Sequence, residues 1–220
     1  MLLHVGAGKA QRLSVLRDSY AAIPGYSAQK INAAYALGGP ALAIQTVRQF
    51  LGNGVEINHV IVVNFERFPQ LINALGGVNV TVRERCVRSD FGGQHFGLRR
   101  GEHHLNGRQA LTYARIRKNS CVPNQDDRDR ARRQQEVLTA MKSKALSPLA
   151  FVRLPWIAWR APQAVVTDMS PPTLFGFLAG MSFGPNPRSN VLAPSGLGPG
   201  GSLIVSEQNK ATAVRRLIGD

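Results

Sequence analysis

The sequence has little negative charge, with 13 acidic residues against 27 lysines and arginines and a formal net charge of +14. This balance indicates an anionic partner, such as nucleic acid, phospholipid or another phosphorylated molecule. No apolar run reaches the ~18 residues of a transmembrane helix, and the N-terminus lacks the basic and apolar segments of a signal peptide. With 44% hydrophobic residues over 220 positions, the chain is expected to form one globular domain.

Several common catalytic and binding motifs are also missing. The sequence holds no Walker loop, no Gly-x-Gly-x-x-Gly ahead of a helix and no His-x-x-x-His pair. Ser14, Ser19 and Ser27 lack the Gly-x-Ser-x-Gly elbow, which argues against a serine hydrolase. His103 and His104 are adjacent and would point to opposite sides of a strand, a poor geometry for one metal ion. No metal ligand is therefore assigned within the chain.

Cysteine is scarce, and Cys86 and Cys121 do not form a Cys-x-x-Cys pair. Two such cysteines do not identify a metal site. In an oxidising compartment they would form one disulfide, closing a loop of about 35 residues and stabilising the fold by about 3–4 kcal/mol. In the cytoplasm they would be free thiols, so these residues leave both states open.

Strand and helix patterns alternate along the first part of the chain. Leu2–Val5 and Arg12–Leu16 are typical of a β-hairpin, and His59–Asn64 is an apolar run typical of a buried strand. Phe65–Leu75 has helical spacing. The alternation predicts an α/β fold with a central mixed β-sheet flanked by helices. Arg83–His104, rich in glycine and charge, is predicted to be a loop.

The C-terminal part of the chain has fewer distinctive features. Leu149–Arg160 is predicted to be an apolar helix that contains Trp156 and Trp159, with Pro155 kinking or breaking it. A last helix is predicted over Glu207–Ile218. No internal repeat or domain break is visible, which favours a single domain.

The most distinctive stretch is Tyr113–Gln134. Arg115 and Arg117 are two residues apart, so both side chains share one face if the segment is extended. The following helix has a stripe of mixed character, formed by Asp127, Arg130, Gln134, Val137, Leu138 and Met141. Because Arg130 and Gln134 share this stripe with apolar residues, both are predicted to point inward. Converging guanidinium groups suit a phosphate or pyrophosphate, while a structural salt-bridge network or a solvated helix remains the alternative.

An ordered series of short motifs covers the first 146 residues. The motifs are Ser14-Val15-Leu16-Arg17-Asp18-Ser19, Ile23-Pro24-Gly25, Lys30-Ile31-Asn32-Ala33-Ala34-Tyr35, Gly38-Gly39-Pro40, Val63-Asn64-Phe65, Leu75-Gly76-Gly77-Val78, His103-His104-Leu105-Asn106-Gly107, Tyr113-Ala114-Arg115-Ile116-Arg117 and Asp127-x-x-Arg130-x-x-Arg133-Gln134. In this order they resemble the LytR-CpsA-Psr family of cell-wall glycopolymer transferases. Leu16 stands where that family usually has proline.

The resemblance implies a phosphotransferase that moves an anionic glycopolymer from a polyprenyl-pyrophosphate carrier to peptidoglycan. Four positions match the family's pyrophosphate-binding, catalytic arginines: Arg17, Arg115, Arg117 and Arg130. Polar contacts around the pyrophosphate are expected from Lys30, Asn32, Asp127 and Gln134. A turn-stabilising role is the alternative for Asn32. The polyprenyl chain is expected in an apolar tunnel between sheet and helices.

The resemblance also implies a Mg²⁺ cofactor, whose aspartate ligands are expected upstream of Met1 together with the first strand and a membrane anchor. Residues 1–183 would then form the catalytic domain, and residues 184–220 would add strands and a helix to the same domain. The expected location is the outer face of the cytoplasmic membrane. A disulfide between Cys86 and Cys121 would fit that location.

Two alternatives to an active transferase remain. The chain could be a fragment that binds polyprenyl phosphate without catalysis, or, ranked last, a basic nucleic-acid-binding regulator. The regulator ranks last because the arginines are predicted at inward-facing positions. The expected partners are therefore the polyprenyl-linked glycopolymer, peptidoglycan and the membrane surface, and nucleic acid is not expected.

Overall fold

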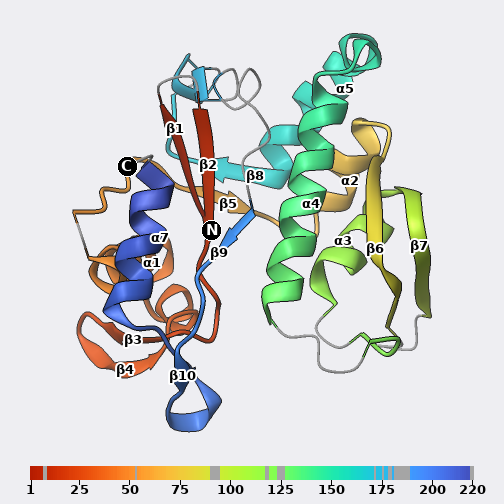
Figure 1. The fold of residues 1–220 in the computed structure, drawn as a ribbon. Coiled ribbons are helices and arrows are strands. Elements are labelled where there is room, and N and C mark those ends of the chain that lie inside the picture. Colours follow the sequence, from red (N-terminus) through yellow and green to blue (C-terminus); the bar gives the residue numbers. More distant parts are fainter. Residues whose placement is uncertain are drawn as a thin grey trace. The chain divides into compact units, whose positions relative to one another are not determined.

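The computed structural model describes the chain apart from residues 7–8, 53, 90–94, 117–118, 123–126, 171, 175, 178–179, 181–188 and 219–220 (Figure 1). The chain divides into two compact units, each with its own core. Unit 1 comprises Met1–Val60 and Thr167–Asp220, and unit 2 comprises Ile61–Val166.

Unit 1 combines short strands with two long helices. Its elements are β1 (Leu2–Gly6), β2 (Lys9–Ser14), β3 (Tyr20–Ile23), β4 (Tyr26–Lys30), α1 (Ala33–Leu51), β9 (Ser189–Val191), β10 (Gly196–Leu197), the 3-10 helix η2 (Pro199–Gly201), β11 (Leu203–Ile204) and α7 (Glu207–Ile218). β1 and β2 form the predicted hairpin, with Leu2 opposite Leu13, and β9 pairs with β2 in parallel. The last helix has the predicted bounds.

The core of unit 1 lies between this sheet and the helices α1 and α7. It includes Leu13, Leu51, Leu192, Val214 and Leu217, all buried. α1 is kinked where the sequence places Gly-Gly-Pro, and its second segment starts at the proline, whose missing N–H is tolerated in a first helical turn. Gly39, which precedes that proline, has a φ of 62°, a backbone conformation that residues with a side chain rarely adopt.

Unit 2 holds most of the arginine-rich stretch. Its elements are β5 (Ile61–Val63), α2 (Phe68–Ala74), β6 (Val78–Ser89), β7 (Phe96–Leu105), α3 (Gly107–Arg115), α4 (Asp127–Ala145), α5 (Pro148–Ala164) and β8 (Val165–Thr167), whose last residue lies at the unit boundary. α4 packs along β6 and α3 (Figure 1). The core of this unit includes Ile72, Val80, Val82, Leu105 and Val137.

The prediction of a loop over Arg83–His104 is wrong. β6 and β7 pair across most of that stretch, from Val78 opposite Leu105 to Ser89 opposite Phe96. Apart from the half-buried Glu84, the charged residues of β6 belong to the exposed face of the pair, while apolar residues alternate with them on the buried face. A charge-rich sequence with a two-residue period is therefore a strand here, because only one face of the ribbon needs to be apolar.

The α/β class is confirmed, but the described strands do not form one continuous central sheet. They pair in one mixed three-stranded sheet, β1-β2-β9, and in four two-stranded sheets. A hydrophobic pattern identifies a strand but does not select its partner, since pairing depends on the tertiary arrangement. The expected division of the domain into residues 1–183 and the added residues 184–220 falls within 181–188, outside the described residues, and stays a prediction.

Over the described residues, none of the helices combines the length and the apolar character that a membrane span requires. The predicted apolar helix is α5, and it continues through Pro155 up to Ala164.

Candidate functional site

α3 carries Arg115 at its C-terminal end, and its start is defined by local hydrogen bonds. The Asn106 side chain accepts from the backbone N–H of Gln109, and the Gln109 side chain accepts from the backbone N–H of Asn106, each over 3.0 Å. This capping box satisfies two donors that a helix start would otherwise leave open. The Asn-Gly-x-Gln sequence therefore fixes the register of α3 and with it the position of Arg115.

Three side chains of α4 hold the C-terminal end of α3. Arg133 donates from Nη2 to the carbonyl of Ile116 over 2.8 Å. Gln134 donates from Nε2 to the carbonyl of Ala114 over 3.4 Å, and Glu136 accepts from the Tyr113 hydroxyl over 2.5 Å. These bonds reach the residues on either side of Arg115 and leave its own guanidinium group outside the network.

This contact region is buried and strongly polar, since Arg133 and Tyr113 are each 1% exposed. Burial, together with the hydrogen bond to Glu136, raises the pKa of Tyr113. Burial also raises the pKa of Glu136, although the Tyr113 hydrogen bond opposes that shift, and burial lowers the pKa of Arg133. A buried guanidinium is tolerated because Glu84, Asp129 and Glu136 favour its charge.

Arg115 itself is exposed to solvent. Its guanidinium carbon lies 5.7 Å from the centre of the Phe65 ring, a cation–π distance. Phe65 is also exposed. The aromatic face orients the guanidinium without occupying its N–H donors, so Arg115 can bind an anion with both N–H edges.

The inward stripe of α4 differs from the predicted one. Arg130 is half-buried and Gln134 is exposed, so the prediction that Gln134 points inward is wrong. Arg133 instead aligns with Val137 and Ala140 at i, i+4 and i+7 and is buried with them. The predicted stripe lies at the edge of the buried face. The helix face that packs on β6 carries Arg133 rather than Arg130 together with the apolar residues.

Two further predicted site residues, Arg117 and Asp127, are not fully described by the structure. Arg117 lies outside the described residues, and Asp127 begins α4 although its side chain lies outside them. Arg133 belongs to the Asp127-x-x-Arg130-x-x-Arg133-Gln134 motif, but no role was predicted for it. Its i, i+4 spacing to Val137 is the signal that could have placed it inward.

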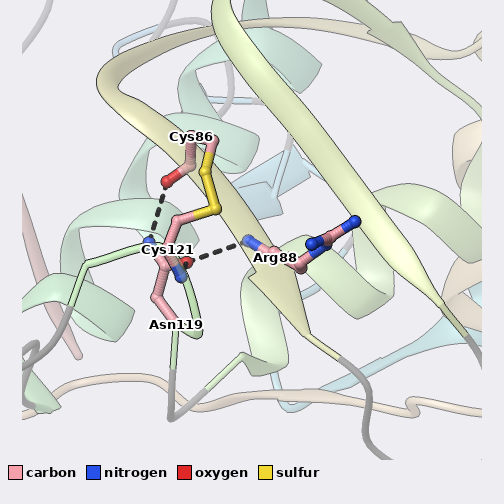
Figure 2. The surroundings of a disulfide bond; sticks show 4 residues. All are labelled: Cys86, Arg88, Asn119 and Cys121. Atoms are coloured by element: carbon pink, nitrogen blue, oxygen red, sulfur yellow. Dashed lines mark hydrogen bonds between the residues drawn. A yellow bond between two sulfur atoms is a disulfide. The ribbon is translucent and has the colours of Figure 1, made fainter.

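A disulfide joins Cys86 of β6 to Cys121 beyond α3 (Figure 2). Next to it, the buried Asn119 donates to the Cys86 carbonyl over 2.9 Å and accepts from the backbone N–H groups of Arg88 (2.9 Å) and Cys121 (3.1 Å) (Figure 2). Asn119 and Cys121 therefore attach this part of the chain to β6. Ile116 is held by α4, so both flanks of residues 117–118 have fixed attachment points.

Unit 1 brings two predicted site residues, Arg17 and Lys30, to one carboxylate, and its backbone links a third, Asn32, to Arg17. Asp18 Oδ1 lies 3.3 Å from Arg17 Nε and 3.8 Å from Lys30 Nζ. The backbone N–H of Asn32 donates to the Arg17 carbonyl over 3.2 Å, and that of Ile31 donates to the Ser19 carbonyl over 2.7 Å. The backbone thus holds the end of β4 next to the Arg17 loop, and the basic side chains remain half-exposed.

Asn32 precedes α1, and its exposed side chain makes no capping hydrogen bond to that helix. Its amide is therefore available for a ligand. In the part of the chain that the structure describes, no three His, Cys, Asp or Glu side chains come close enough to hold a metal ion.

Comparison with known proteins decides the family. The sequence model of the LytR_cpsA_psr family matches residues 1–186. The chain belongs to the LytR-CpsA-Psr family. The predicted family resemblance is thereby confirmed, and so is the α/β fold class, because solved structures of the family share the fold.

Two relatives and one solved structure illustrate the similarity. The regulatory protein MsrR of Staphylococcus aureus (strain COL) is 38% identical over 178 residues, or 80% of this chain and 51% of MsrR. The polyisoprenyl-teichoic acid–peptidoglycan teichoic acid transferase TagT of Bacillus subtilis (strain 168) is 38% identical over 146 residues, or 64% of this chain and 43% of TagT. A solved structure of TagT bound to LIIa-WTA is 28% identical with a TM-score of 0.73, and the match covers 96% of this chain and 80% of that one.

The chain spans about half the length of the curated relatives that it matches.

Proposed function

We propose that this LytR-CpsA-Psr chain is the phosphotransferase part of a cell-wall enzyme that moves an anionic glycopolymer from a polyprenyl-pyrophosphate carrier to peptidoglycan. The observation that carries the proposal is the end of α3, where the buried Arg133 and the exposed Gln134 of α4 hold the backbone on either side of Arg115 and leave its guanidinium exposed. A cation held in advance by its backbone suits a charged transition state, because little reorganisation is needed during the reaction. The similarity to TagT, named as a teichoic acid transferase, supports the choice of substrate.

The proposed reaction needs charge stabilisation more than covalent catalysis. An acceptor hydroxyl oxygen would attack the phosphorus that bears the glycopolymer, and the bond from that phosphorus to the bridging oxygen would break. Polyprenyl phosphate would leave with the bridging oxygen, and the acceptor would lose its proton. The role of Arg17, Arg115, Arg117 and Arg130 would be to bind the pyrophosphate oxygens, with Lys30, Asn32 and Gln134 adding polar contacts.

Mg²⁺ remains part of the proposal, with carboxylate ligands upstream of Met1. The described residues do not fit the ion by themselves, since Asp18 is a single carboxylate already next to Arg17 and Lys30. No step is therefore assigned to the metal.

We also propose that the domain works at the outer face of the cytoplasmic membrane, attached by a segment that precedes Met1. The disulfide between Cys86 and Cys121 supports this location, because such bonds persist mainly in oxidising compartments.

The test is turnover of a polyprenyl-pyrophosphate-linked glycopolymer by the full-length protein. Arg115→Ala and Arg130→Ala should each reduce turnover by about a hundredfold or more, the cost of losing one donor to a charged transition state. Arg132→Ala is the matched control, because Arg132 lies on α4 but is exposed and paired with Asp129 at 3.4 Å. Unchanged turnover in the Arg115 variant would contradict the proposed site.

A regulatory role is the second candidate, because MsrR is named as a regulatory protein. A DNA-binding regulator with this charge should bind duplex DNA with an affinity that falls steeply as salt rises. Absence of binding at low salt would exclude it. Turnover by the 220-residue chain alone would exclude the other alternative, a fragment that binds polyprenyl phosphate without catalysis.

A further inference from the structure

α5 exposes an apolar face to solvent. Val152 is 79% exposed, and Trp156 and Trp159 are each 66% exposed. These residues stand at i, i+4 and i+7, so they form one stripe along the helix, and the exposed Pro155 lies beside it. An amphipathic helix normally buries its apolar stripe, and an exposed one marks an interaction surface.

The same helix is basic and holds no carboxylate. Its charged residues are Arg153 and Arg160, and within the described part of the chain neither forms an ion pair. Arg160 donates from Nη1 to Gln163 over 3.3 Å. The guanidinium of Arg153 lies against the turn after α2, where a Cβ added to Gly76 would be 1.9 Å from its Nη1 atom.

A pocket of about 460 Å³ opens between α2 and α5 at the side of this stripe. Its lining residues are Gln70, Asn73, Ala74, Arg153, Trp156 and Arg160. The buried Oε1 atom of Gln70 has no hydrogen-bond partner among the described residues. The pocket thus offers two cations for an anion next to an exposed aromatic ring.

We propose that α5 docks onto an anionic phospholipid membrane. Trp156, Trp159 and Val152 would enter the headgroup region, where tryptophan is favoured because its ring is apolar and its N–H is polar. Arg153 and Arg160 would bind a lipid phosphate in the pocket, since guanidinium groups match phosphate oxygens geometrically. The arrangement is that of an interfacial helix, with a basic edge beside an apolar face.

Charge favours a lipid surface over a second copy of the chain. In a symmetric pair, each copy would present the same patch to the other. Arg153 and Arg160 of one copy would then approach the same residues of its partner, with no carboxylate of α5 to offset them. The net charge of +14 would oppose that association and favour an anionic bilayer.

The inference adds a docking surface to the proposed membrane location. It uses none of the residues proposed for transfer, and its test does not depend on turnover, so either proposal can fail while the other stands.

The chain offers a selective probe, because its only two tryptophans are Trp156 and Trp159. We would add phosphatidylcholine vesicles, with and without phosphatidylglycerol, to the 220-residue protein and record tryptophan emission. Emission should move to shorter wavelength with the anionic vesicles and be quenched by brominated acyl chains. Emission that stays unchanged while the protein sediments with the vesicles would overturn the proposal, because another basic surface would then be bound.

Matched variants distinguish vesicle binding through α5 from binding through the overall positive charge of the protein. Arg153→Gln combined with Arg160→Gln should weaken vesicle binding about thirtyfold, at roughly fivefold for each basic residue near an anionic surface. Arg215→Gln combined with Arg216→Gln, on the exposed face of α7, removes the same charge and should cause no comparable loss. Equal losses from the two pairs would overturn the proposal.

A second pair of variants tests the apolar stripe by co-sedimentation. Trp156→Ala combined with Trp159→Ala should abolish sedimentation with anionic vesicles, whereas Leu197→Ala, at a 77% exposed apolar residue of unit 1, should leave it intact. Circular dichroism would verify that each variant is folded. An emission shift that grows with protein concentration in the absence of lipid would overturn the proposal in favour of self-association.

Discussion

Unit 1 and unit 2 hold their basic residues by different means. In unit 1, Arg17 and Lys30 are half-exposed and meet at one carboxylate, that of Asp18. In unit 2, Arg133 is buried among ionisable groups and binds the backbone carbonyl of Ile116, while Arg115, the residue before Ile116, is exposed. An arginine side chain therefore stabilises the backbone where it is buried, and it remains available to a ligand where it is exposed.

The two units also differ in how easily their charged groups can rearrange when a ligand binds. Exposed ion pairs such as those of Asp18 contribute little to stability, so ligand binding can rearrange them at small cost. A buried guanidinium that has lost its hydration cannot rearrange without leaving other groups unpaired. We expect unit 2 to hold its site rigidly and unit 1 to adjust to the ligand.

The largest effect is expected from the buried arginine. Arg133→Met should lower the free energy of unfolding by about 3–5 kcal/mol, because Glu136 loses a favourable charge and the Ile116 carbonyl loses its donor. Urea denaturation would measure it. Arg17→Met in unit 1 is the control and should change stability by no more than about 0.5 kcal/mol. Equal losses of unfolding free energy in the two variants would contradict the proposed difference between the two units.

Reduction of the disulfide should have a similar but smaller effect on unit 2. Cys86 and Cys121 are 35 positions apart, and opening that loop should cost about 3–4 kcal/mol of stability. Denaturant unfolding with and without a reducing agent would measure the loss. A Cys86→Ser and Cys121→Ser variant should be insensitive to the reductant, and a sensitive variant would contradict this explanation.

The exposed arginines should affect turnover rather than stability. In the full-length protein, Arg17→Ala and Arg115→Ala should each reduce turnover about a hundredfold, equivalent to roughly 2.7 kcal/mol of transition-state stabilisation. If both side chains bind the same pyrophosphate, the combined variant should lose less than the product of the single losses. Strictly multiplicative losses would indicate that the two units act on separate steps.

The smallest expected effect is a pH dependence confined to unit 2. Burial raises the pKa of Glu136, so the stability linked to this group is present below its unfolded pKa of about 4.3 and declines as pH rises through the folded value. Glu136→Gln should remove that decline. Unfolding free energies measured across this range for both proteins would test it, and parallel curves would show that Glu136 is not responsible.

Part of the site was predictable because its signals are local. Asn106 and Gln109 are three residues apart in a capping box, a short-range pattern that defines the start of α3. The kink in α1 and the bounds of α7 follow from similar short-range patterns. The β6–β7 pair was missed because its charged face resembled a loop, and the partner strand, whose residues lie between 7 and 27 positions away, supplies what the local sequence does not show.

The family, the hairpin of β1 and β2, the start of α3 and the basic residues available for a phosphate all follow from local spacing and residue order, which a chain carries before it folds. Three other features arise only when distant parts of the chain pack together. Arg133 rather than Gln134 is buried, Asn119 attaches its loop to β6, and Trp156 and Trp159 face solvent. Burial depends on which elements come to cover a given helix face, and residues distant in the sequence determine that cover.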